Sequence, residues 1–138
     1  GDGAIETWDA MYETNLKTAV TACKVFLPAL AAADGSAIVN VGAAAAARAA
    51  AGMGAYAASK SGVLRLTEAL ADESKDRGVR VNAVLPGIID TPANRQAMPD
   101  ADRSRWVSPE MIAEVVAFLL SDASRGVTGV GIPVTGRL

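Results

Sequence analysis

Apolar side chains recur every three or four residues between Glu6 and about Leu30, which predicts a long amphipathic helix. Asp34-Gly35 marks the turn that ends it. Residues 37–41 (AIVNV) then predict a short strand that is apolar on both faces. Such a strand is typical of the centre of a parallel sheet covered by helices on both sides.

The alanine-rich stretch 42–55 is ambiguous. The intrinsic propensity of its alanines favours a helix. Its glycines (Gly42, Gly52 and Gly54) and its lack of large apolar side chains favour a loop or a short, weakly held helix. We expect a loop here.

A second helix is predicted from Tyr56 to Asp76, with Gly78 placed to cap it in a left-handed conformation. Residues 79–85 (VRVNAVL) are rich in β-branched side chains and predict the next strand. Residues 88–107 carry two prolines and several polar side chains, so we expect an irregular segment.

Ser108-Pro109-Glu110 predicts the start of a third helix, with serine as N-cap and proline in the first turn. Its expected buried face consists of Ile112, Val115, Val116, Leu119 and Leu120. Residues 131–134 predict an edge strand, because Pro133 cannot donate a ladder hydrogen bond. The order helix-strand-helix-strand-helix-strand predicts an α/β fold with a parallel sheet. Three strands leave one flank of such a sheet uncovered.

Composition narrows the class of protein. A length of 138 residues fits one domain, and a net charge of -2 with scattered Lys and Arg makes nucleic acid an unexpected partner. Histidine is absent, which removes the commonest metal ligand, and no metal site is expected. Cys23 is the single cysteine and is expected to be a small core residue. With no signal peptide and no membrane span expected, the sequence predicts a soluble, cytoplasmic protein.

Tyr56 and Lys60 are four residues apart on the second predicted helix, so they share a face. A nearby ammonium group stabilises a phenolate and lowers the phenol pKa, which suits a tyrosine to general acid–base work. The same spacing also arises by chance in structural helices. Asn15 is a second candidate, because an amide on an apolar helix face needs a partner, a kink or a water.

A third group follows the strand 79–85. Pro86, Gly87 and Thr91 come directly after its carboxyl end. Ligands of open α/β sheets bind beyond the carboxyl ends of the strands. This group, the loop after Val41 and the start of the Tyr56 helix are therefore expected to border one crevice. Arg48, alone among alanines, could reach it.

The ordered set of these motifs resembles the short-chain dehydrogenase/reductase family over essentially the whole chain. The motifs are Asn15-Leu16, residues 38–41 (IVNV), 56–60 (YAASK), 80–87 (RVNAVLPG), Thr91, Thr128-Gly129 and 133–136 (PVTG). The resemblance implies a Rossmann-like, doubly wound parallel sheet, of which residues 1–138 are the carboxyl-terminal half. It also implies an NAD(P)-dependent oxidoreductase that transfers hydride between a nicotinamide and an alcohol or carbonyl substrate.

The resemblance further implies roles for individual residues. Tyr56 would exchange a proton with the substrate oxygen, while Lys60 would hold the nicotinamide ribose and lower the tyrosine pKa. Asn15 would organise a water in the proton relay. The segment 92–107 would be a mobile lid over the substrate, although Trp106 is expected to be a packing anchor.

The cofactor contacts implied by the resemblance extend into the segment after the strand. Pro86, Gly87, Ile89 and Thr91 would border the nicotinamide end of NAD or NADP. The helices 6–30 and 56–76 would pair with their two-fold mates in a homodimer or homotetramer. The small side chains of Ala57, Ala58, Ser59 and Gly62 would permit that close approach.

Two departures from the family pattern change the expectation. The glycine-rich phosphate loop is not found in the sequence, so we expect the chain to be part of a longer domain. The usual catalytic serine position is occupied by Ala43. Loss of one such donor typically lowers the rate about a hundredfold or more. An impaired oxidoreductase is therefore one reading, and an inactive family member with a binding or assembly role is the alternative.

Overall fold

The structure is a computed structural model that describes residues 3–137, so Gly1, Asp2 and Leu138 of the expected range 1–138 lie outside the described residues. Strand β2 (Arg80–Pro86) is the centre of a three-stranded parallel sheet with the order β1-β2-β3. Strand β1 (Ala37–Val41) pairs along one side of it and β3 (Gly131–Val134) along the other. The α/β class and the parallel sheet are as the sequence predicts.

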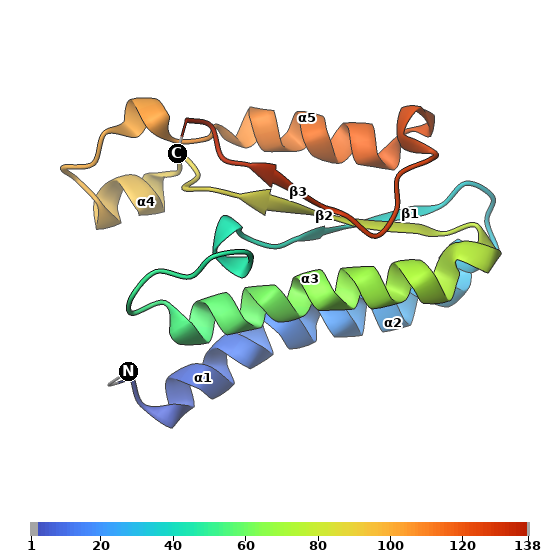
Figure 1. Cartoon of the computed structure of the whole chain (residues 1–138), viewed down its shortest axis with the longest axis horizontal. Coiled ribbons are helices and arrows are strands. Elements are labelled where there is room, and N and C mark those ends of the chain that lie inside the picture. Colours follow the sequence, from blue (N-terminus) through green and yellow to red (C-terminus); the bar gives the residue numbers. More distant parts are fainter. Residues whose placement is uncertain (1–2, 138) are drawn as a thin grey trace.

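The position of β1 differs from the expectation. The sequence placed it at the centre of the sheet, but in the described residues it is an edge strand, and β2 takes the centre. Helices cover both of its faces, as its apolar sequence predicted (Figure 1). Val41, at its carboxyl end, is 53% exposed. Strand β3 lies at the other edge, where Pro133 was expected.

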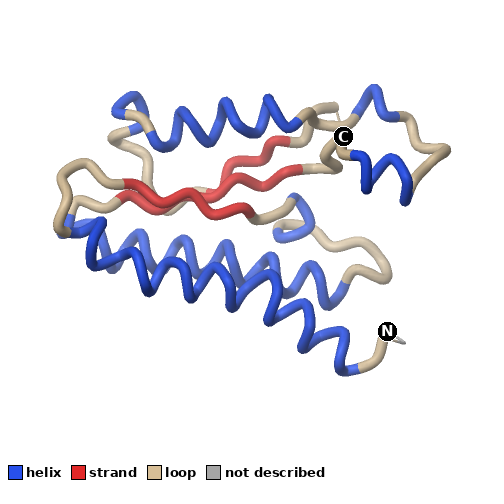
Figure 2. Tube along the Cα trace, turned by 180° about the vertical axis from the view of Figure 1, so that it is seen from behind, coloured by secondary structure: helices blue, strands red, loops and turns tan. Residues whose placement is uncertain are grey.

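Helices form a layer on each face of the sheet (Figures 1 and 2). One layer holds α1 (Ile5–Met11), α2 (Thr18–Ala31) and α3 (Gly54–Ser74), and α5 (Pro109–Leu120) covers the opposite face. The predicted first helix is confirmed as one continuous helical segment. Its central part, Tyr12–Lys17, is wound as a π-helix.

The helix ends follow the predicted local chemistry. After α3 a short 3-10 turn leads to Gly78, whose φ of 71° is the left-handed conformation that glycine adopts without strain. The Ser108 hydroxyl caps α5 by accepting a hydrogen bond from the Met111 amide at 3.3 Å. Both caps are confirmed.

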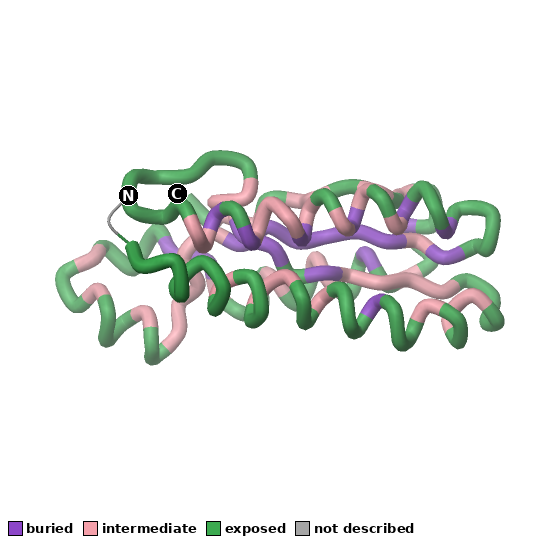
Figure 3. The backbone as a smooth tube through the Cα atoms, turned by 90° about the horizontal axis from the view of Figure 1, so that it is seen from below, coloured by how far each residue is buried: buried purple, intermediate pink, exposed green. Residues whose placement is uncertain are grey.

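The buried face of α5 is narrower than predicted. Leu119 is fully buried, whereas Leu120 is 50% exposed. Successive helical residues lie about 100° apart around the axis, and with Leu119 turned to the sheet, Leu120 lies at the margin of the buried face. Figure 3 shows this pattern, with buried residues concentrated in the strands and exposed residues on the outer helix surfaces.

The segment after β2 is more ordered than predicted. It contains the short helix α4 (Pro92–Ala97) and a 3-10 turn at Arg103–Arg105. The alanine-rich stretch before α3 is a loop, as expected, with a single 3-10 turn at Ala44–Ala46. Within residues 3–137, no helix combines the length and apolar character that crossing a membrane requires.

Three of the four small residues of α3 are packed inside the chain. Ala57 and Ser59 are each 5% exposed. A methyl group on Gly62 would lie 2.6 Å from Leu16 Cδ2, so Gly62 lets α3 approach the π-helical segment. Ala58 is exposed, and the contact with a two-fold mate stays a prediction.

Buried polar side chains of β2 fix the return of the chain to β3. The Asn82 side chain is fully buried, donates to the Val127 carbonyl at 2.9 Å and accepts from the Val130 amide at 3.2 Å. Arg80 donates to the Leu119 and Ser121 carbonyls at the end of α5. The motif 80–87 thus combines an apolar strand with side chains that hold its neighbours.

Candidate active site

A pocket of about 830 Å³ lies at the carboxyl end of β2, beside the first turn of α3 and below α4. All three strands point towards this side of the molecule (Figure 1). The pocket is lined by Ala43, Ala44, Ala45, Arg48, Ala50, Met53, Tyr56, Pro86, Gly87, Ile88, Asn94, Met98 and Thr135. The crevice expected from the sequence is therefore present as a pocket in the structure.

Tyr56 and Lys60 lie on the same face of α3, as their spacing predicts. The Lys60 Nζ is 6.0 Å from the centroid of the Tyr56 ring. It donates a hydrogen bond of 3.2 Å to the Val41 carbonyl at the end of β1. Tyr56 lines the pocket, and Lys60 lies behind it, towards the sheet.

The pKa of Tyr56 differs in direction from the one that the sequence predicted. Burial raises the pKa of the Tyr56 phenol and lowers the pKa of the Lys60 ammonium. The sequence predicted that the ammonium would lower the phenol pKa. That effect requires close approach, and here the ammonium is directed to a backbone carbonyl. Desolvation therefore dominates for both groups.

Asn15 lies within the π-helical segment and reaches α3 through a serine. Its Nδ2 donates to Ser59 Oγ at 3.1 Å and to Met11 Sδ at 3.4 Å. Ser59 Oγ in turn donates to the Tyr56 carbonyl at 2.7 Å. The amide that the sequence marked as needing a partner is thus tied to the turn that carries Tyr56. Short π-helical stretches inside helices are frequent at functional sites.

Ala43 occupies the pocket wall at the point where β1 ends. It is 6% exposed, has an extended backbone and precedes the 3-10 turn Ala44–Ala46. The preceding Gly42 continues the ladder by donating to the Val84 carbonyl at 2.9 Å. The side chain at position 43 is therefore part of the pocket surface, but a methyl group offers no hydrogen bond there.

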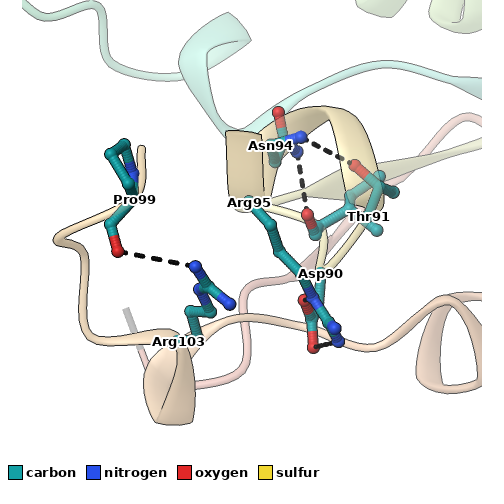
Figure 4. Close-up of polar contacts among 7 residues, drawn as sticks. Asp90, Thr91, Asn94, Arg95, Pro99 and Arg103 are labelled. Carbon is teal, nitrogen blue, oxygen red and sulfur yellow. Dashed lines mark hydrogen bonds and ion pairs between the residues drawn. The ribbon is translucent and has the colours of Figure 1, made fainter. Parts of the chain in front are cut away.

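The four residues expected at the nicotinamide end divide into two pairs. Pro86 and Gly87 line the pocket, whereas Ile89 and Thr91 do not. The Thr91 hydroxyl oxygen accepts from the Asn94 amide and caps α4 (Figure 4). Ile89 uses its carbonyl to accept from the Asn94 side chain at 2.8 Å. Ile88, one residue earlier, lines the pocket in place of Ile89.

Comparison with known proteins agrees with this geometry. A family model described as enoyl-(acyl carrier protein) reductase matches residues 2–136. The 3-oxoacyl-(acyl-carrier-protein) reductase FabG of Thermotoga maritima is 37% identical over 141 residues, covering 96% of this chain and 57% of the relative. The chain belongs to the short-chain dehydrogenase/reductase family.

Two further proteins similar to the chain carry different names within this family. Cyclohexanol dehydrogenase of an Acinetobacter species is 38% identical, with 96% of this chain and 55% of the relative covered. The NADPH-bound short chain oxidoreductase of Pseudomonas aeruginosa PAO1, described as containing an atypical catalytic center, superposes with a TM-score of 0.89 at 28% identity. That superposition covers 99% of this chain and 59% of the other. The chain spans little more than half the length of these family members.

The sequence did not predict several of the residues that line the pocket. Ile88, Asn94, Met98 and Thr135 were not expected, Met53 lies in the loop after Val41 that was expected to border the crevice, and Arg48 was expected only as able to reach it. A local signal existed for two of them. Thr91-Pro92 has the form of a helix N-cap followed by proline in the first turn. A helix starting there places Asn94 and Met98 one turn apart on the same side.

The α4 segment is held by local polar contacts, which Figure 4 shows. Arg95 forms two hydrogen bonds with Asp90, at 2.6 and 2.8 Å, and these lower the pKa of the Asp90 carboxyl. Arg103 Nη2 donates to the Pro99 carbonyl at 3.4 Å. Trp106 is 7% exposed and is the packing anchor that the sequence predicted. The α4 segment thus forms one side of the pocket, and these contacts hold it in place.

We predict that, without nicotinamide, the Tyr56 phenol ionises above the ordinary tyrosine value, because burial disfavours the phenolate. The tyrosinate ultraviolet difference spectrum of the protein and of its Tyr56→Phe variant isolates this step. A Tyr12→Phe variant is the matched control, since Tyr12 is 51% exposed, and circular dichroism monitors folding at each pH. A Tyr56 step at or below the ordinary value would mean that Lys60 outweighs burial.

Proposed function

We propose that the chain is the catalytic part of an NAD(P)-dependent oxidoreductase that acts on an alcohol or carbonyl substrate, with Tyr56 as the general acid–base. One observation carries the proposal. Tyr56 lines an open pocket with Pro86 and Gly87 at the carboxyl end of β2, and Lys60 lies one helical turn behind it. This is the edge of a parallel sheet at which α/β proteins bind ligands.

The relatives support this class of reaction. The named ones are a reductase, a dehydrogenase and an oxidoreductase seen with NADPH. We further propose that residues 1–138 are the carboxyl-terminal part of one Rossmann-like domain and that the phosphate-binding part lies outside them. The outer edge of β1 has no strand partner among residues 3–137, which fits a sheet that continues there.

The chemistry of the described residues fits the nicotinamide end of NAD or NADP. An ammonium group has three protons, and Lys60 donates one to the Val41 carbonyl, so two are available for ribose hydroxyls. Thr91 does not line the pocket, but its hydroxyl accepts from a backbone amide and keeps its own proton, which we propose it donates to a carboxamide that reaches the start of α4. Pro86 and Gly87 offer an apolar, side-chain-poor surface for a flat ring.

A reduced nicotinamide held beside Lys60, Pro86 and Gly87 would supply the hydride that the carbonyl carbon needs. Tyr56 donates its phenolic proton to the carbonyl oxygen, which yields the alcohol, and the reverse steps apply to oxidation. The raised pKa keeps this proton on Tyr56 near neutral pH. An approach of Lys60 to the phenol would stabilise the phenolate that forms. Asn15 holds the turn of Tyr56 through Ser59 and is proposed to position the water that returns the proton.

Alanine at position 43 is consistent with a reduced rate of hydride transfer and also with a family member that has no activity. A hydroxyl donor at this wall would stabilise negative charge that develops on the reacting oxygen, and alanine cannot. An inactive family member with a binding or assembly role is therefore the alternative. The presence of Tyr56, Lys60 and Asn15 at one site favours the enzyme.

The first test is turnover. We predict that the protein at its natural length oxidises or reduces members of an alcohol and ketone panel with NAD(H) or NADP(H). Tyr56→Phe should lower kcat about a hundredfold or more, the range for a positioned general acid–base. Tyr12→Phe, on the exposed surface, should leave the rate unchanged. Equal turnover in Tyr56→Phe and the unaltered protein would remove this mechanism.

The second test restores the missing donor. We predict that Ala43→Ser raises kcat about a hundredfold, because the side chain lies on the pocket wall beside Tyr56. Ala50→Ser is the matched control, since Ala50 also lines the pocket but lies in the exposed loop. A gain in Ala43→Ser alone supports an impaired active site. No gain would favour the binding or assembly role.

Self-association is also part of the proposal. Exposed aromatic side chains lie along α1, the π-helical segment and α2, where Trp8, Tyr12 and Phe26 are 46%, 51% and 61% exposed. We predict a homodimer or homotetramer by light scattering at micromolar concentration. Phe26→Glu should shift it towards monomer, because an unpaired charge would be buried. A monomer in the unaltered protein would contradict the prediction.

A further inference from the structure

Among residues 3–137, one charged residue lines the candidate active-site pocket. That residue is Arg48, and the other polar side chains are Tyr56, Asn94 and Thr135. The remaining lining is alanine, methionine, proline, glycine and isoleucine. The Arg48 side chain is exposed and solvated, so it would attract a negatively charged ligand group as the one cation beside an otherwise uncharged pocket wall in the described residues, not through a low dielectric.

The backbone of Arg48 is anchored, while its side chain is exposed. The Arg48 amide donates to the Ala44 carbonyl at 3.4 Å, and the Ala46 amide donates to the Ala43 carbonyl at 2.9 Å. Ser61, on α3, donates to the Ala46 carbonyl at 2.9 Å. These bonds join the 3-10 turn to the helix that carries Tyr56. The backbone of Arg48 is therefore fixed with respect to Tyr56, the proposed proton donor.

Neighbouring groups do not neutralise this cation. In residues 3–137 no carboxylate forms an ion pair with Arg48. Asp90 is the acid of the adjacent α4 segment, and it is engaged with Arg95 (Figure 4). Asn94 donates one of its two side-chain N–H groups to the Ile89 carbonyl and keeps one neutral donor. Among the described residues of the pocket lining, Arg48 is thus the cation with which an anionic ligand group would pair.

We propose that Arg48 selects a substrate that bears a carboxylate, and that the pocket holds the reacting carbonyl or alcohol carbon at Tyr56 with the carboxylate at Arg48. The inference rests on the proposed function and names its substrate class. The planar guanidinium matches a carboxylate with two parallel hydrogen bonds. A phosphate would present more charge and more acceptors than one guanidinium and an apolar wall can satisfy. Arg48 is in this view a specificity-determining residue.

The experiment compares acids with their neutral esters. The protein at its natural length is assayed with methyl-ketone carboxylates of increasing chain length and with the methyl ester of each. We expect at least one acid to be preferred over its ester. In Arg48→Gln, KM for that acid should rise about 10- to 100-fold, the range for a lost charge-assisted hydrogen bond, with kcat and the ester little changed. Arg48→Lys should raise KM less than Arg48→Gln does, because lysine keeps the positive charge but lacks the two parallel N–H donors of the guanidinium.

Arg77→Gln is the matched control, because it removes the same charge from an exposed site in the turn after α3. That helix has 21 residues, so the control site lies about 30 Å from Tyr56 along its axis. Its KM for the acid should be unchanged. Equal effects of Arg48→Gln on acid and ester, or no effect on either, would overturn the proposal.

Binding separates this inference from the proposed function. The same acid and ester are titrated calorimetrically in the presence of oxidised nicotinamide, which cannot reduce a ketone. Arg48-dependent binding of the acid, without turnover of any substrate, would uphold carboxylate recognition and remove the oxidoreductase proposal. Turnover of esters and acids alike, with binding independent of Arg48, would remove the inference and leave the oxidoreductase.

Discussion

A chain of buried hydrogen bonds joins α2, β1 and α3, and the position of the site depends on it. Cys23 Sγ donates to Asn40 Oδ1, and Asn40 Nδ2 donates to Thr67 Oγ1 at 3.0 Å. Thr67 then donates to the Val63 carbonyl at 2.8 Å within α3. Each of these polar groups is buried, so losing one partner would leave another unsatisfied in a low-dielectric interior. The network therefore holds α3 in one position against the sheet.

That position places the first turn of α3 at the carboxyl edge of the strands. Tyr56 then lines one pocket with Pro86 and Gly87. Burial at this position raises the phenol pKa of Tyr56 and lowers the ammonium pKa of Lys60. The fold thus places Tyr56 at the pocket and favours its protonated form. In the proposed mechanism, a closer approach of Lys60 to the phenol must supply the opposite effect.

The pocket walls come from segments with little regular structure. The loop with Arg48 is tied to α3 by Ser61, and α4 is tied to the end of β2 by Asn94. Loops on a rigid scaffold can change their side chains without disturbing the core. Positions 43 and 48 are therefore places where the chemistry of the pocket can change while the sheet and α3 are kept.

The sequence by itself determined the order of helices and strands, both helix caps, the parallel class of sheet and the shared face of Tyr56 and Lys60. These features depend on local spacing and on residues such as Gly78 and Ser108, whose backbone preferences act over a single turn. It also marked Asn15 as an amide that needed a partner. Only the tertiary structure decided that the partner is Ser59, 44 residues away.

Tertiary structure likewise decided which strand is central, which of Leu119 and Leu120 faces the sheet, and that Ile88, not Ile89, lines the pocket. It reversed the expected pKa direction at Tyr56, because desolvation depends on everything packed around a group, while the sequence shows only the neighbour four residues away. Local patterns fix elements, whereas burial and long-range contacts fix the chemistry of the site.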